Sequence, residues 1–146
     1  MPATSETPVE LVTRFLQLLA DQRVDEAADL LSPDVVYTNV SLPSIRGRER
    51  VRKLGRISTE RGMGFEVYLH ASSADDGVVL NERTDVLIFG RLRIQFWVFG
   101  RFEVRDGEIV VWRDAFDWLD MGRGLLRGLL GVAVPSLGRS VPRVSR

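Results

Sequence analysis

The 146-residue chain contains no cysteine and only one histidine, His70. The lack of cysteine excludes disulfide bonds, thiolate metal sites and cysteine nucleophiles, and it is compatible with a reducing cytoplasm. With one histidine, a metal site would consist almost entirely of carboxylates, and no loop has the acidic spacing typical of calcium sites. We therefore expect no metal site.

An excess of charge of one sign is also absent, because 20 basic residues balance 20 acidic ones. No basic stripe is interleaved with aromatic residues, so nucleic acid is not an expected partner. The first eight residues are polar and lack the basic start and apolar run of a signal peptide. Export is therefore not indicated, and we expect a cytoplasmic location.

A long uninterrupted apolar run is absent as well. The most apolar stretch, residues 118–134, is shorter than a membrane span and contains Arg123 and Arg127. We expect no stable membrane insertion. This stretch predicts a helix that lies over the mouth of a cavity or in a subunit interface, with membrane-surface contact as the weaker alternative.

The rest of the chain has the composition of one soluble domain, with 45% apolar residues and enough length to bury a core. We expect a flexible leader over residues 1–8, a single domain over residues 9–134 and a disordered basic tail over residues 135–146. Apolar residues at three-and-four spacing predict helices. These predicted helices cover residues 9–20, 24–31 and 48–60.

The other segments predict strands, because they are rich in β-branched and aromatic residues and alternate in polarity. Asp-Gly pairs at 76–77 and 106–107 are typical of hairpin turns and indicate a four-stranded meander. The predicted strands cover residues 35–40, 65–71, 78–89, 92–104 and 108–116. The fold class is therefore α+β: a curved mixed sheet wrapped around three or four helices, forming a cone with a deep apolar pocket.

An arginine and an aspartate lie two residues apart inside the strand predicted for residues 78–89. Alternation places Asn81, Arg83 and Asp85 on the same face, among apolar neighbours. A buried ion pair costs desolvation free energy that two apolar residues would avoid. Taken alone, however, such a pair is more often a solvated or cross-strand contact than a site.

Three further polar side chains fall on the inner face of the predicted cone. Tyr37 and Asn39 share one face of the first strand, and Asp114 lies in the last strand. Two aspartates that share Arg83 would resist being charged together, so that one keeps a proton and the other stays ionised. This arrangement supplies an acid and a base. A structural polar network is an equally good interpretation of the residues alone.

The motifs Tyr37-x-Asn39, Glu82-Arg83-x-Asp85 and Trp112-Arg113-Asp114 resemble those of the limonene-1,2-epoxide hydrolase family, which has the nuclear-transport-factor-like cone fold. Gly100-x-Phe102 and Asp106-Gly107-x-Ile109 also match, in the same order. The resemblance runs from about residue 9 to residue 117, and it departs at Ala115, where the family commonly has tyrosine. It implies that Tyr37 and Asn39 position a water, Asp114 is the base, Asp85 is the general acid and Arg83 bridges the two aspartates.

The resemblance also implies one concerted step with water, without a covalent intermediate, metal or organic cofactor, that converts an apolar epoxide of terpenoid, fatty-acid or sterol type into a vicinal diol. By face and by resemblance, six apolar residues would form the substrate wall, with Leu125 and Leu129 as lid residues. The six are Leu16, Leu19, Leu87, Phe96, Val98 and Phe116. Their interpretation as ordinary core residues stays open.

Three alternatives remain at this point. Tyr37 and Asp114 alone would suit a ketosteroid isomerase or polyketide cyclase, and the same cone would suit a non-catalytic binder of apolar ligands. His70 suggests a dehydratase, although a lone histidine in a strand is most often a surface or packing residue. Trp97 and Phe99, on the outer face of their strand, would be unusually apolar for a monomer, so we expect a homodimer.

Overall fold

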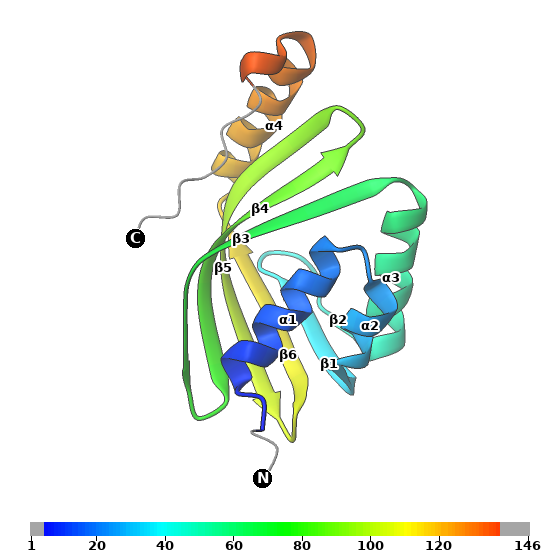
Figure 1. Cartoon of the computed structure of the whole chain (residues 1–146), viewed down its shortest axis with the longest axis vertical. Helices are drawn as coiled ribbons and strands as arrows, with labels where there is room; N and C mark the ends of the chain where they lie inside the picture. Colours follow the sequence, from blue (N-terminus) through cyan, green and yellow to red (C-terminus); the bar gives the residue numbers. More distant parts are fainter. Residues whose placement is uncertain (1–4, 138–146) are drawn as a thin grey trace.

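A computed structural model of the chain describes residues 5–137 and shows one six-stranded sheet curved around helices (Figure 1). The helices are α1 (Pro8–Ala20), α2 (Val24–Asp29), α3 (Arg48–Glu60), α4 (Trp118–Ala133) and the 3₁₀ helix η1 (Pro135–Leu137). The strands are β1 (Leu31–Asn39), β2 (Ile45–Arg46), β3 (Met63–Asp75), β4 (Val78–Phe89), β5 (Leu92–Arg105) and β6 (Glu108–Phe116). Their order in the sheet is β2-β1-β6-β5-β4-β3. Because β1 is parallel to β6 and the other pairs are antiparallel, the sheet is mixed, and the predicted fold class is confirmed.

The first strand differs from its prediction. Helix α2 ends at Asp29 instead of residue 31, and β1 begins at Leu31, so that Pro33 lies inside the strand. Proline is tolerated there because the register with β6 shifts between Leu31 and Val36, which leaves the intervening residues outside the regular ladder. The two-residue strand β2 was not predicted, since two residues are too few to show alternation.

The domain begins earlier than the predicted leader allows. Thr7 caps α1 in a capping box with Glu10, and Pro8 is the first helical residue. At the other end, η1 covers the first three residues of the predicted tail. Residues 1–4 and 138–146, which include the rest of the predicted leader and tail, lie outside the described residues.

Helix α1 supplies the main contact between the helices and the concave face of the sheet (Figure 1). Its apolar stripe is buried, and Phe15 packs edge-on against Phe102 and Trp112 of the sheet. The buried stripe of α1 thus forms the core of the domain together with the concave face of the sheet.

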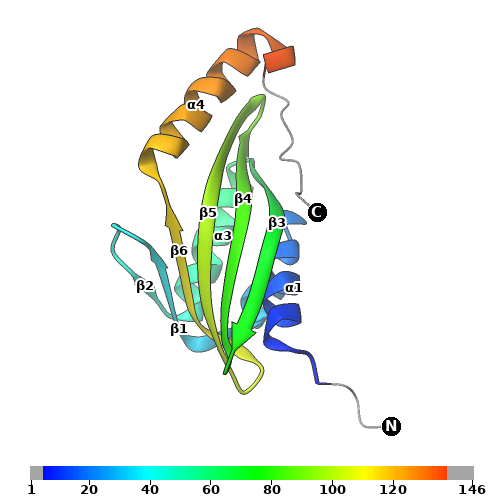
Figure 2. The same cartoon turned by 90° about the vertical axis from the view of Figure 1, so that its left-hand side faces the viewer.

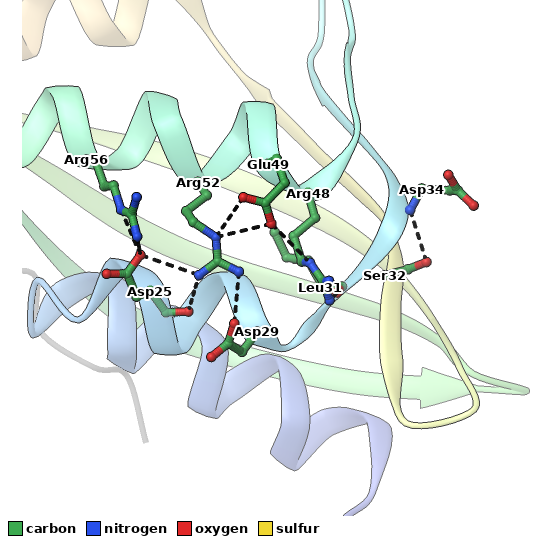
Figure 3. Close-up of polar contacts among 9 residues, drawn as sticks. All are labelled: Asp25, Asp29, Leu31, Ser32, Asp34, Arg48, Glu49, Arg52 and Arg56. Atoms are coloured by element: carbon green, nitrogen blue, oxygen red, sulfur yellow. Dashed lines mark hydrogen bonds and ion pairs between the residues drawn. The ribbon is translucent and has the colours of Figure 1, made fainter.

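Helix α3 forms a second wall and is attached to α2 by ion pairs (Figure 3). Arg52 of α3 contacts Asp25 at 3.4 Å and Asp29 at 2.9 Å, both on α2, and also Glu49 at 3.3 Å. The two helices approach closely at Gly55, where a Cβ would meet the Val24 side chain at 2.6 Å. This contact fixes the face of α3 that turns toward the sheet.

Helix α4 lies along β5 beyond the end of β6 (Figure 2). Strand β5 pairs with β6 only from Val98 onward, so its first residues have a free edge on that side. Asp120 accepts a hydrogen bond from the Trp97 backbone N–H at 2.7 Å, and Gly124 and Gly128 are buried against the β5 backbone. The helix therefore covers an exposed strand edge. In the part of the chain that the structure describes, no helix is long and apolar enough to cross a membrane.

Candidate active site

Arg83 is at the centre of a buried ion-pair bridge between β4 and β6. Its Nε donates to Asp85 Oδ1 at 2.9 Å and its Nη2 to Asp85 Oδ2 at 3.2 Å. The same Nη2 lies 2.8 Å from Asp114 Oδ2. All three residues are almost fully buried, with at most 6% of any of them exposed. The structure thus brings together the arginine and the two aspartates singled out in the sequence.

Burial favours the neutral form of each group in the bridge, whereas contact between opposite charges favours the ionised forms. Burial raises the pKa of Asp85 to about 6, although the attraction of Arg83 acts to lower it; the nearby Asp114 charge also raises it. For Arg83, burial favours the neutral form, but the two carboxylates more than offset it and hold its pKa above the usual range. Arg83 is therefore a permanent cation, whereas Asp85 can carry a proton near neutral pH.

Tyr37 and Asn39 lie beside this bridge on β1, the neighbour of β6. Asn39 is paired with Asp114 in the parallel ladder, and its Nδ2 donates to Tyr37 Oη at 2.8 Å. The pKa of Tyr37 is raised to about 12, mainly by burial and then by the Asp114 charge. Its hydroxyl therefore keeps its proton and has it available for donation.

Trp112 also contacts the site, a role that the sequence reasoning did not assign. Its Nε1 donates to Asp114 Oδ2 at 2.9 Å, and its ring stacks on Tyr37 with centroids 3.9 Å apart. The signal was present, because residues 112 and 114 share a face by alternation. Asp114 Oδ2 thus has two donors, while Oδ1 is buried without a hydrogen-bond partner among the described residues.

All five predicted polar residues line one cavity of about 280 Å³. The six residues predicted for an apolar wall line it too, from α1 (Leu16, Leu19), β4 (Leu87), β5 (Phe96, Val98) and β6 (Phe116). The cavity is closed further by residues of α3 and β3, among them Leu54 and Phe65. It is thus a largely apolar chamber, with the buried bridge on one wall and further polar side chains, Gln22, Arg52, Ser58 and Thr59, elsewhere in the lining.

The lid role expected for two residues of α4 is not matched by this cavity. Leu125 and Leu129, expected as lid residues, are exposed and do not line it, because α4 turns its glycines toward β5; its contribution to the lining is Met121. His70, expected as a surface or packing residue, is not part of the lining. It bonds Thr84 Oγ1 at 2.8 Å, where β3 shifts register against β4.

Comparison with known proteins decides the family. The profile of the limonene-1,2-epoxide hydrolase catalytic domain matches residues 6–127. Epoxide hydrolase EphG of Mycobacterium tuberculosis is 51% identical over 126 residues, which cover 86% of this chain and 84% of EphG. The chain belongs to the limonene-1,2-epoxide hydrolase family. It is therefore an epoxide hydrolase, whose reactants are an epoxide and water.

Solved structures agree with membership of the limonene-1,2-epoxide hydrolase family. A structure described as an M. tuberculosis LEH-like epoxide hydrolase has a TM-score of 0.89 and 48% identity, and the match covers 97% of this chain and 99% of that one. An NTF2-like protein of unknown function from Cytophaga hutchinsonii has a TM-score of 0.65 at 19% identity, over 80% of this chain and 95% of that one. The second likeness concerns the fold alone, and it is the cone fold that the sequence motifs implied.

Proposed function

We propose that the enzyme opens an apolar epoxide in one step, with Asp114 as the base that activates water and Asp85 as the acid that protonates the ring oxygen. The observation that carries this proposal is the difference between the two oxygens of Asp114. Its Oδ2 is occupied by Arg83 and Trp112, whereas Oδ1 has no partner among the described residues. Oδ1 is thus the oxygen that can accept a proton from water.

Tyr37 and Asn39 fit the role of orienting this water. Because Asn39 donates to the Tyr37 oxygen, the Tyr37 hydroxyl proton can point to a water oxygen. The water then donates one hydrogen to Asp114 and presents its remaining lone pair to an epoxide carbon. Attack from this side inverts that carbon, so a cyclic epoxide gives a trans diol.

The charge of the site is the same before and after the reaction, and Arg83 stabilises it. Asp114 gains a proton from water as Asp85 gives one to the oxygen leaving carbon, so one carboxylate of the pair is ionised both before and after the step. Arg83 contacts both aspartates and therefore stabilises either state. A proton returned from Asp114 to Asp85 restores the enzyme, and no covalent intermediate forms.

The apolar wall supports a terpenoid, fatty-acid or sterol-like epoxide as substrate. Apart from the bridge, the charged residue that lines the cavity is Arg52, which is bound to Asp25 and Asp29 on α2. A substrate with its own charge would find no free counter-ion among the described lining residues, whereas hydrocarbon gains from burial. The cytoplasmic location expected from the sequence stays a prediction.

Product analysis in ¹⁸O-labelled water tests this function. A panel from limonene oxide to fatty-acid and sterol epoxides is offered to the wild type and to Asp114→Asn. We expect labelled diol from the wild type and a decrease in kcat of at least about 100-fold in the variant, with binding of the epoxide largely kept. Several epoxides that bind without being opened would overturn the proposed reaction.

We also propose that the enzyme is a homodimer. Trp97 and Phe99 on β5 are 42% and 39% exposed, and the neighbouring helix α4 exposes Leu119 and Leu126 by 63% and 60%. Because α4 packs on β5, these side chains belong to adjacent elements. An apolar area of this kind is typical of a surface that another subunit covers.

A further inference from the structure

Arg83 reaches Asp114 only by crossing β5. Asn81 on β4 is paired with Gly100 on β5, and Gly100 is paired with Asp114 on β6. Neighbouring strands are about 4.8 Å apart, so β4 and β6 are separated by about 10 Å. Arg83 lies two residues after Asn81 on β4 and faces the same side of the sheet. Its side chain spans this separation and places Nη2 beside Asp114.

Gly100 provides the space for this crossing. A Cβ at this position would overlap Arg83 Nη1 and would lie 2.5 Å from Asn81 Oδ1 and 3.0 Å from the Phe102 ring. The backbone of Gly100 is in the ordinary negative-φ range, so glycine is not required there for its conformation. The requirement is the absence of a side chain beneath the guanidinium.

Asn81 holds the edge of the guanidinium that neither aspartate contacts. Its Oδ1 accepts from Arg83 Nη1 at 3.1 Å, and the residue is only 2% exposed. Its Nδ2 is buried without a hydrogen-bond partner among the described residues, which costs free energy that an apolar residue would avoid. Packing alone therefore does not account for an amide at this position.

We propose that Asn81 and Gly100 are positioning residues for epoxide hydrolysis, which together fix the Arg83 guanidinium on the bridge between Asp85 and Asp114. The inference rests on the proposed function. With Asn81 in place, Arg83 is held along three edges, and Gly100 lets it lie flat across β5. Without either, the guanidinium is displaced from the bridge, and its attraction for Asp85 weakens.

The charged and titratable groups around the bridge are few. From β4 they are Arg83 and Asp85, from β6 Asp114, from β1 Tyr37, and from α3 Arg52, which is paired with carboxylates of α2. The α1 and β3 residues that line the cavity carry no charge. Since Arg83 is the cation in contact with Asp85, its displacement should raise the pKa of Asp85.

The test compares Gly100→Ala and Asn81→Leu with two matched controls. Gly64→Ala is the glycine control, since a Cβ at that strand position would meet the Ile88 side chain at 3.2 Å and not the guanidinium. Thr84→Val is the polar control, because Thr84 is also buried on β4 but bonds His70 outside the cavity. Thermal melting identifies any variant that does not fold.

We expect kcat to decrease at least about tenfold in both positioning variants with KM little changed, and the alkaline limb of the pH profile to move to higher pH. The controls should keep the wild-type profile. The Asp85 titration, followed by carboxyl ¹³C NMR, should move in the same direction. Because this readout needs no turnover, it tests the positioning role even if no epoxide is opened. A wild-type Asp85 titration in folded Gly100→Ala and Asn81→Leu would overturn the proposal.

Discussion

At Asp85, burial outweighs the attraction of a neighbouring arginine, and this raises the pKa to about 6. An aspartate in the unfolded chain has a pKa near 3.9. Between these values the folded state binds more protons than the unfolded state, so the contribution of Asp85 to stability is complete below about pH 4 and is lost as the pH rises through 6. The same proton is the one that the proposed reaction delivers.

The first prediction therefore concerns Asp85→Asn. The free energy of unfolding of the wild type, relative to the variant, should decrease by about 2 kcal/mol between pH 4 and pH 7.5, since the asparagine does not titrate. Urea denaturation of both proteins across this range measures the difference. A constant difference would contradict a raised pKa at this position.

A second prediction concerns the activity that depends on the same proton. The value of kcat/KM should fall as the pH rises above about 6, because the free enzyme loses the proton that Asp85 delivers to the epoxide oxygen in the proposed reaction. Steady-state rates measured from pH 5 to pH 9 with the best epoxide would show this decrease of kcat/KM. An activity that is unchanged across this range would assign the acid to another group.

The five polar residues of the site could be predicted from the sequence because alternation within one strand shows which side chains share a face. The prediction that these five residues form one catalytic site depended on the resemblance to the family. Trp112 was seen only as part of a motif, and the role of Gly100 was not seen. The space that Gly100 provides for Arg83 depends on the register of three strands, which a periodic pattern in one strand does not contain.

At the scale of elements, α4 shows how two glycines can have opposite effects in one helix. Gly124→Ala should destabilise the protein by about 1–3 kcal/mol, because its Cβ would overlap the Gln95 carbonyl on β5. Gly122→Ala should stabilise it by about 0.5–1 kcal/mol, since the space there is open and alanine favours helix. Urea denaturation compares them, and equal effects would argue against the close approach of α4 to β5.

Element boundaries could be predicted where turn residues define them. Helix α3 and strands β4 and β6 have the bounds expected from the sequence, with the Asp-Gly pairs at 76–77 and 106–107 as turns. The start of β1 was predicted four residues too late, because Pro33 indicates the end of a helix more strongly than it indicates a strand. The packing of α4 along β5 could not be predicted, because the free edge of β5 arises only when β6 ends early.

At the scale of the whole molecule, the outer face of the sheet carries more apolar surface than a monomer needs. Phe99 of β5 faces away from the cavity. Because 39% of this residue is exposed, it contributes little to the core. If a second subunit covers this face, a charge introduced there should prevent association without changing the fold, because desolvating an unpaired charge in an interface is costly.

We therefore expect the wild type to sediment as a dimer at micromolar concentration and Phe99→Arg to sediment as a monomer. Val40→Arg serves as a control, since Val40 is similarly exposed, at 43%, but lies in the turn after β1 and belongs to neither β5 nor α4. Sedimentation equilibrium with both variants decides the matter, and circular dichroism checks that the fold is kept. A monomeric wild type would leave the exposed face of β5 and α4 without a second subunit and would contradict the proposed homodimer.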